Sequence, residues 1–366
     1  MNNKHKFSAG SVLGWLFFLR ETLLELFYKV STSPSINVLD ICGRQRLQTL
    51  SLCEYTINGV EPNFQRFPCL TSLSLKRVSI SAEDLNSLLL AFPKLERLEL
   101  SNPIIRTIDD AVDSVDITIK LHCPTFKSLV LKNVEQSKFI LENGCIECVD
   151  VNHCYFGSFK VRGSKSLTHF KFVQSEAQIL DIEEGDKLEV LEFVASHVNH
   201  SNLFPMKIHT PRLRTFRIWG FSEAPDCGFE IDEERSYIAV DSDQISACSP
   251  QLRHLAIFFE GGERCDHAFG GLSYMENVVL LEIGWDSFDG FWELVEKVLK
   301  YCPNVRKLVV HGMVPRRQDE KFLELFGQHT TSMVETMRKY QHIQLQILYS
   351  YDFDSSNPLT DRWLLL

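Results

Sequence analysis

The densest group of potential metal ligands lies between residues 145 and 154. Cys145, Cys148, His153 and Cys154 bring four soft ligands into ten residues, and such a set can hold zinc. However, the apolar residues among them follow a repeat described below, and strand alternation directs Cys148 away from Cys154. Cys154 then falls in a turn where a thiol bonds backbone groups. We therefore expect structural cysteines here, and neither a metal site nor a cofactor.

The sequence motifs of common catalytic centres are absent. The chain has no Gly-x-x-x-x-Gly-Lys phosphate loop, no His-Glu-x-x-His zinc helix and no Gly-x-Ser-x-Gly elbow. Its 12 histidines are dispersed, without a Ser/His/Asp or Cys/His grouping. Asn199-His200-Ser201 matches the glycosylation pattern, but one such match is common by chance. The sequence thus indicates no catalytic residues and a binding protein rather than an enzyme.

Charge and cysteine content narrow the class of partner and the compartment. The net charge of −10 argues against a nucleic-acid partner, because such proteins normally present a basic face. The 11 cysteines are scattered and odd in number, which is not typical of a disulfide framework. Reduced, buried thiols favour a cytoplasmic or nuclear setting.

A short apolar frame recurs along the chain and must position any binding residues. It reads apolar, two variable residues, apolar, one variable residue, apolar, as in Leu47/Leu50/Leu52. Eleven such frames follow one another, and their first residues are separated by 23, 25, 31, 20, 21, 21, 25, 39, 26 and 27 positions. Most intervals match the leucine-rich range of roughly 20–29 residues. The frames begin at Leu47, Leu70, Leu95, Phe126, Ile146, Leu167, Leu188, Leu213, Leu252, Val278 and Val305.

The frame predicts an α/β leucine-rich-repeat solenoid, a right-handed β-α superhelix. Its last two apolar residues alternate on a short strand, so both point to one face. One repeat cannot bury this face, whereas stacked neighbours can. The strands then form a parallel sheet on the concave side, and the return segments form an irregular or helical convex side.

Several return segments carry helix signals. Ser81 precedes two acidic residues and a helical apolar pattern that Pro93 ends, which predicts a capped helix. The same pattern from Phe291 onward precedes Pro303. The repeats from 146 to 188 are too short for a helix, so we expect extended or turn-like returns there. Beyond the last frame, the pattern predicts helices near 317–326 and 330–340, separated at Gly327, and an edge strand over 342–349.

The concave face is the predicted binding surface, and its late repeats carry the residue types that concentrate binding energy, namely Trp and Arg beside aromatic and charged groups. The predicted protein-binding residues are Arg217, Trp219, His254, Phe258, Glu282, Lys307 and His311. An alternative is that Trp219 and Phe258 are covered by the acidic segment 221–249 and merely pack. That segment is predicted to be a projecting loop, either solvated or a contact for a basic partner. Within it, residues 237–240 suit the strand of a degenerate repeat.

The N-terminal region has two interpretations. Lys4, His5 and Lys6 precede an apolar run that ends at Arg20, which resembles a signal peptide. The run is too short to span a membrane, and the apolar pattern resumes at Leu23. An amphipathic capping helix over about 11–29, without membrane association, accounts for both halves of the pattern.

Four segments resemble the repeats of plant F-box/leucine-rich-repeat proteins of the FBD-like type, in which an apolar helix, Cys-Pro-x-Leu and a strand follow one another. The resemblance extends over roughly 36–312. It rests on residues 88–100, 122–126, 249–252 and 298–308.

The resemblance implies an organisation and a set of partners. It implies an N-terminal capping region over 1–35 as an F-box remnant, irregular repeats over 36–312, and a helical cap with an edge strand over 313–366. It further implies a protein substrate on the concave face, and a Skp-type linker with a cullin where the remnant functions. The first repeat is preceded by neither the Leu-Pro opening nor the Arg-Trp pair of an F-box. A stand-alone scaffold or immune-receptor-like repeat protein without a ligase link is therefore the alternative.

Overall fold

The structure is a computed structural model of the 366-residue chain. It describes residues 7–42, 46–60, 67–106, 118–122, 125–142, 144–194, 196–201, 209–219, 222–223, 240–259, 269–285, 290–314 and 320–351. The chain forms two compact units. Unit 1 comprises Met1–Leu167 and Ser175–Glu184, and unit 2 comprises Thr168–Gln174 and Gly185–Leu366.

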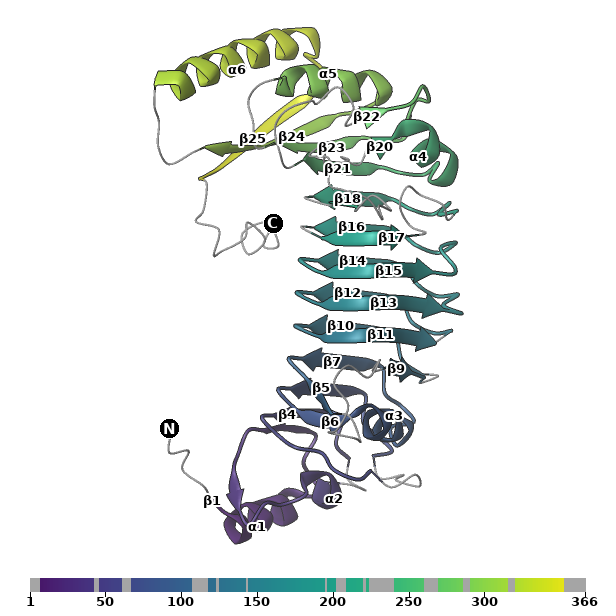
Figure 1. The fold of residues 1–366 in the computed structure, drawn as a ribbon, viewed down its shortest axis with the longest axis vertical. Coiled ribbons are helices and arrows are strands. Elements are labelled where there is room, and N and C mark those ends of the chain that lie inside the picture. Colours follow the sequence, from purple (N-terminus) through teal and green to yellow (C-terminus); the bar gives the residue numbers. More distant parts are fainter. Residues whose placement is uncertain are drawn as a thin grey trace, which may run out of the picture. The chain divides into compact units, whose positions relative to one another are not determined.

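Parallel strands, one per repeat, form the main sheet of each unit (Figure 1). In unit 1 they are β2 (Glu25–Tyr28), β4 (Thr49–Cys53), β5 (Ser72–Lys76), β7 (Arg97–Ser101), β10 (Ser128–Lys132) and β12 (Cys148–Asn152). In unit 2 they are β14 (His169–Val173), β16 (Val190–Val194), β18 (Thr215–Trp219), β21 (His254–Phe259), β23 (Leu280–Trp285), β24 (Lys307–Val314) and β25 (Gln344–Tyr351).

Every predicted frame forms a main-sheet strand. Its second and third apolar residues are buried, and equivalent residues pair in register, as Leu50 with Leu73 and Leu255 with Leu281 do. The first residue of the frame lies in the turn that enters the strand, where the Leu95 amide donates to the Phe92 carbonyl at 3.1 Å. Each buried side chain contributes about 1.5–3 kcal/mol. The predicted leucine-rich-repeat fold is therefore confirmed.

A residue with left-handed backbone follows six of these strands. Glu54, Arg77, Asn102, Asn133, His153 and Gln174 have φ between 44° and 55°. The Glu54 amide donates to the Lys76 carbonyl at 2.9 Å, and the Arg77 amide donates to the Ser101 carbonyl at 2.8 Å. Hydrogen bonds between neighbouring repeats thus hold a conformation that non-glycine residues rarely adopt. This corner turns the chain from the main sheet into the return segment.

In the middle of unit 1 the return segments form a second parallel sheet. It consists of β9 (Thr118–Leu121), β11 (Glu135–Glu142), β13 (Tyr155–Arg162) and β15 (Glu176–Ile182). Phe139, Phe156 and Phe159 fill the space behind it, with ring centroids 5.0–5.7 Å apart. The extended returns predicted for the short repeats are confirmed, and these strands add a hydrogen-bonded layer that the frame did not reveal.

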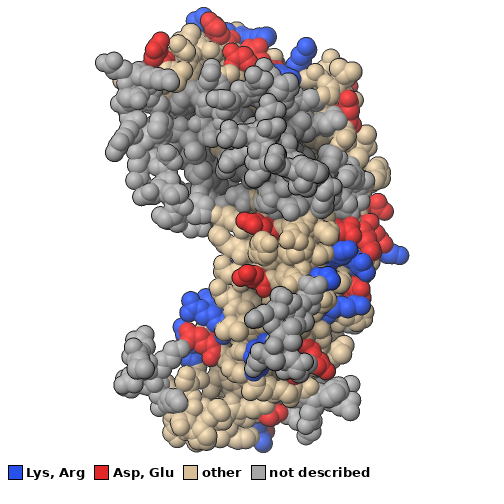
Figure 2. All heavy atoms as spheres, in the orientation of Figure 1, with Lys and Arg blue, Asp and Glu red and all other residues tan. Residues whose placement is uncertain are grey.

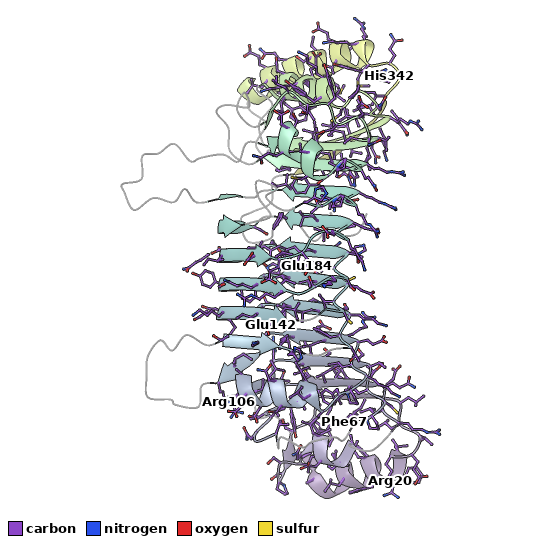
Figure 3. All side chains as sticks on the ribbon, turned by 90° about the vertical axis from the view of Figure 1, so that its right-hand side faces the viewer. Arg20, Phe67, Arg106, Glu142, Glu184 and His342 are labelled. Carbon is purple, nitrogen blue, oxygen red and sulfur yellow. The ribbon has the colours of Figure 1, made fainter. Side chains whose placement is uncertain are left out.

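Gly157 allows two strands of this second sheet to approach closely, and ion pairs connect the ends of its strands. A Cβ at Gly157 would lie 2.6 Å from the Ser137 carbonyl oxygen, so the close strand approach requires glycine. At the ends of the strands, the Glu142 carboxylate lies 2.9 Å from the Lys120 ammonium (Glu142 is labelled in Figure 3). The Arg162 guanidinium pairs with Glu183 at 3.3 Å. Surface pairs of this kind add little stability, so the phenylalanine core holds the layer.

Helices form several return segments elsewhere. The predicted capped helix is α3 (Ala82–Leu90), where the Ser81 hydroxyl accepts from the Asp84 amide at 2.9 Å. The predicted helix after residue 290 is α5 (Phe291–Tyr301). Shorter elements complete the described chain: β1 (Phe7–Ser8), β3 (Thr32–Ser33), α2 (Val38–Cys42), β6 (Ser79–Ser81), β8 (Ile104–Arg106), β17 (His197–Ser201), β19 (Ser222–Glu223), β20 (Val240–Asp241), α4 (Ser242–Cys248) and β22 (Phe269–Gly270).

The two predicted C-terminal helices are one helix, α6 (Glu320–Lys339), which runs through Gly327. A single glycine costs only about 1 kcal/mol in a helix. Contacts with α5 stabilise α6: Glu296 of α5 accepts from the Thr336 hydroxyl at 3.2 Å and the Lys339 ammonium at 2.6 Å. The predicted edge strand is β25, which pairs in parallel with β24.

The predicted helix over 11–29 is wrong in its second half. Helix α1 (Ala9–Leu19) ends before Arg20 (labelled in Figure 3), and residues 25–28 form strand β2. The spacing of the apolar residues after Leu23 suits either structure. Strand β4 offers hydrogen-bonding partners, and the Gln48 and Thr49 amides both donate to the Leu24 carbonyl. None of the described helices combines the length and apolarity needed to cross a membrane.

Within the acidic segment 221–249, predicted to be a loop, the described residues belong mainly to β19, β20 and α4. Its last part forms helix α4, and the Asp243 carboxylate accepts from the Leu272 and Ser273 amides at 2.9 and 2.6 Å. A hydrogen bond from the Ser273 side chain, together with these two backbone hydrogen bonds, lowers the pKa of Asp243, so this carboxylate serves the fold of unit 2. Residues 224–239, including most of the segment suggested as a degenerate strand, lie outside the described residues.

Candidate protein-binding face

All seven predicted binding residues lie on main-sheet strands of unit 2. Arg217 and Trp219 belong to β18, His254 and Phe258 to β21, Glu282 to β23, and Lys307 and His311 to β24. Each alternates with the buried residues of its frame, so its backbone position faces the opposite side of the sheet. We call this side of unit 2 the charged face. The Trp219 side chain lies outside the described residues.

Strand register arranges the charged face in rows across the sheet. The central row contains most of its charges, and the row two residues further along each strand is mainly apolar. The central row is Lys171, Glu192, Arg217, Ala256, Glu282 and Val309. The apolar row is Val173, Val194, Trp219, Phe258, Gly284 and His311.

Ion pairs of alternating sign connect the central row. The Glu192 carboxylate lies 3.1 Å from the Lys171 ammonium and 3.6 Å from the Arg217 guanidinium. Arg217 also reaches Glu282 at 3.9 Å. Arg217 therefore lies between two carboxylates, and the ion pairs hold its long side chain in place.

Ala256 makes the longest of these contacts geometrically possible. Arg217 and Glu282 are two strands apart in register, with Ala256 between them. Their backbones are therefore separated by about 10 Å. Because the methyl group of Ala256 is short, the two long side chains can meet above it.

Two histidines complete the environment of Glu282. The His254 Nε2 atom lies 2.9 Å from one carboxylate oxygen, and the His311 Nε2 atom lies 3.3 Å from the other. Burial raises the pKa of Glu282. Hydrogen bonds from both histidines and the charges of His254 and Arg217 lower it by more than burial raises it, so the pKa lies well below the usual range. Glu282 is thus ionised and anchors three side chains from neighbouring strands.

The aromatic residue Phe258 is buried, which differs from its predicted role as a binding residue. A Cβ added to Gly284 would lie 1.8 Å from its ring. The ring therefore lies against the Gly284 backbone and occupies the apolar row. Phe258 thus packs within unit 2, as one part of the alternative interpretation held; the other part, coverage by segment 221–249, falls largely on residues outside the described part of the chain.

Lys307 is half-exposed and, among the described residues, belongs to none of the ion pairs of the central row. Lys171 and Glu192, by contrast, belong to the network but escaped the prediction. Each stands between the two apolar strand residues of its frame, as Arg217 and Glu282 do. That shared position is the sequence signal by which Lys171 and Glu192 can be identified.

The cysteine group is structural. The Cys154 thiol accepts from the Val134 amide at 3.4 Å and donates to the Asn152 carbonyl at 3.1 Å, as predicted for its turn position. Burial raises its pKa to about 12, and Cys148 lies on the open side of β12. Within the described part of the chain, no group of three or more His, Cys, Asp or Glu residues could hold a metal ion.

Unit 1 contains a separate cavity of about 640 Å³ beside α2. The Tyr55 hydroxyl donates to the Ile36 carbonyl at 2.8 Å and accepts from the Val38 amide at 3.1 Å. The Tyr28 and Tyr55 rings meet edge to face at 5.8 Å. Tyr55 thus fixes the segment leading into α2, and its hydroxyl is already bonded to the protein.

Helix α1 in unit 1 leaves a large apolar surface exposed. Its sequence contains no charged residue, and Ala9, Val12 and Leu16 are its buried side. Trp15 is 64% exposed and Phe18 is 86% exposed. Contiguous exposed apolar groups of this size commonly mark an interaction site. We call the exposed side chains of Trp15, Phe17, Phe18 and Leu19 the α1 surface.

Parallel strands joined by repeated corners, with a preorganised side-chain network on one face, define a leucine-rich-repeat binding protein. Residues 22–146 match the family model of the leucine-rich repeats of FBD-associated F-box protein At5g56370. The chain is 37% identical to F-box/LRR-repeat protein At1g67190 of Arabidopsis thaliana over 357 residues, which cover 95% of this chain and 80% of that protein. The chain belongs to the F-box/LRR-repeat family.

Proposed function

We propose that this protein is the substrate-recognition component of a Skp–cullin ubiquitin ligase and that it binds its protein substrate on the charged face. Membership of the F-box/LRR-repeat family supports the ligase connection. The substrate role is supported by one observation above all: side chains from β14 to β24 are locked together by ion pairs on an open sheet face. The reduced, buried thiols of Cys42, Cys154 and Cys302 fit a proposed cytoplasmic or nuclear location.

The network favours binding because it is already ordered. Binding becomes less favourable by about 0.5–1.5 kcal/mol for each long side chain that the interface immobilises. In unit 2 the ion pairs with Glu192 and Glu282 restrict Lys171 and Arg217 before any partner arrives. A partner therefore meets groups whose positions are set, which suits recognition rather than chemistry.

The α1 surface supports the linker contact. Trp15 and Phe18 lie three residues apart and are both largely exposed, so they project from the same side of α1. A helix that presents aromatic groups in this way fits a groove on a helical partner. In this proposal the Skp-type linker binds the α1 surface in unit 1, and the substrate binds the charged face in unit 2.

Co-purification with a recombinant Skp-type linker and cullin tests the ligase role. We expect the wild-type chain to retain both proteins and Trp15→Ser with Phe18→Ser to lose them. The control is Leu323→Ser, which removes a comparably exposed apolar side chain, 56% exposed, from α6. Linker recovery that is equal in all three chains would place the contact elsewhere. No recovery with the wild type would favour the stand-alone scaffold.

Quantitative pull-down from plant extract tests the charged face. Arg217→Ala with Trp219→Ala should reduce recovery of specific partners while leaving the linker bound. The matched control is Lys132→Ala, which removes a half-exposed cation that pairs with Glu99 at 3.1 Å in unit 1. Unchanged partner recovery from the folded double variant would contradict the proposed substrate site.

A further inference from the structure

The charges of the charged face differ in depth according to their sign. The Glu192 side chain is 7% exposed, whereas its partners Lys171 and Arg217 are 35% and 27% exposed. Glu282 is 19% exposed and is contacted by Arg217, His254 and His311. The carboxylates therefore form the base of the network, and the ends of the cations face outward.

This layering decides which charge a partner can contribute. A basic partner would have to displace Lys171 or Arg217 to reach Glu192, and that carboxylate would lose close ion pairs in a buried setting. A carboxylate arriving from outside meets ammonium and guanidinium groups with hydrogen-bonding capacity to spare, since Arg has five N–H donors and Lys has three. The local preference is thus for an anion, even though the whole chain has a net charge of −10.

An apolar strip runs beside the cations. Val173 and Phe258 are buried, Val194 is half-buried, and Gly284 presents no side chain. These residues occupy the row that neighbours Lys171 and Arg217 along the strands. Of these residues, Val194 is the one that a partner can reach beside the cations.

We infer that the charged face binds a peptide segment in which acidic residues stand next to apolar ones. The inference rests on the proposed function, because it names the chemistry of the substrate for that same face. The carboxylates of the segment bind the outer ends of Lys171 and Arg217. Its apolar side chains lie beside Val194, the half-buried residue of the apolar row.

Selection from a random peptide library displayed on phage, with the full chain as bait, tests the inference. Bound peptides should be enriched in Asp and Glu beside apolar residues. A selected peptide, once labelled, should bind at least about tenfold more weakly after Lys171→Gln with Lys307→Gln. Lys171→Gln alone tests the named contact, because it leaves the Arg217 ion pairs intact. Lys171→Arg keeps the charge and should preserve binding, and so should Lys132→Gln on the open side of unit 1.

The outcomes separate the two proposals. Enriched peptides without acidic residues, or equal weakening by Lys132→Gln, would overturn the acidic-segment inference and leave the recognition role standing. A library that yields no peptide above background would count against both. Asp-to-Asn and phosphoserine versions of a selected peptide identify the anion: loss with Asn supports a carboxylate, and binding only after phosphorylation overturns it.

Discussion

The open sheet faces of the two units rest on the same repeat but carry different side chains. In unit 1 the corresponding positions mix short hydroxyls, such as Ser51, Ser72 and Ser74, with charged residues such as Glu99 and Lys132, which pair with each other. In unit 2 they hold long charged groups that interlock across five or more strands. The buried positions are alike in both units, so the comparison shows that the core fixes the scaffold while the alternate positions are left to specialise.

Neither unit displays a large area of one charge where its surface is visible. In Figure 2, Lys and Arg lie among Asp and Glu over the described residues of the face that is drawn. Within unit 1, Lys132 pairs with Glu99 and Lys120 pairs with Glu142. The distinction between the units is therefore one of side-chain length and connection, rather than of net charge.

The largest effect should come from the second sheet of unit 1. Phe159→Ala removes a buried ring that stacks on Phe139 at 5.3 Å. We expect a loss of about 3–5 kcal/mol in the free energy of unfolding, measured by urea denaturation. Tyr155→Ala in the same sheet, at a 44% exposed position, should change it by less than about 0.5 kcal/mol. Equal losses would show that this sheet does not enclose a core.

A fall in pH should destabilise the packing of helices α5 and α6 in unit 2. His329 of α6 is packed among the rings of Phe291, Trp292 and Phe326, and burial lowers its pKa from 6.5 to about 4. The unfolded chain therefore binds a proton between pH 6.5 and pH 4 that the folded chain does not. The stability is complete above this window and falls within it as the pH falls, by at most about 3 kcal/mol.

Thermal unfolding across that pH range tests the effect. The decrease in Tm should largely disappear in His329→Leu and persist in His342→Leu, which alters an exposed histidine (labelled in Figure 3). An unchanged pH dependence in His329→Leu would mean that other groups cause the acid sensitivity.

Substitutions at two glycines of unit 2 test its local packing in opposite directions. Gly284→Ala places a methyl group against the Phe258 ring and should cost about 1–3 kcal/mol. Phe258→Leu should recover part of that loss in the double variant. Gly327→Ala meets no heavy atom within 4 Å and should stabilise α6 by about 0.5–1 kcal/mol. Destabilisation by both substitutions, measured by urea denaturation, would contradict the local packing described here.

The smallest effect tests the contrast between the open faces directly. Ala256→Leu should separate Arg217 from Glu282, at a cost of about 1 kcal/mol, because the larger side chain occupies the space above the strand. Ser74→Leu is the control in unit 1, where the Ser74 hydroxyl donates to the Glu99 carboxylate at 3.4 Å. A double-mutant cycle between positions 217 and 282 measures the coupling, which should vanish in the Ala256→Leu background. Coupling that survives there would show that Ala256 is not required.

The sequence was most informative where one pattern recurred many times. Each frame supplies the same pair of buried residues, so the strands, their register and the grouping of Arg217, His254, Glu282 and His311 could be predicted. It was least informative where local propensity competes with tertiary contacts. Gly327 does not end α6 because contacts with α5 stabilise the part of the helix that follows it, and residues 25–28 form a strand because β4 lies beside them. The contact of Arg217 with Glu282 above Ala256 likewise could not be predicted from the sequence.

The repeated left-handed corner has a consequence for how such a chain can change its length. Asn133, His153 and Gln174 occupy equivalent corners, 20 and 21 residues apart. A deletion or duplication from one corner to the next removes or adds one complete coil and rejoins backbone of the same conformation. We expect the middle of this protein to tolerate gain or loss of whole coils, so that the family can alter the span of its array without redesigning either end.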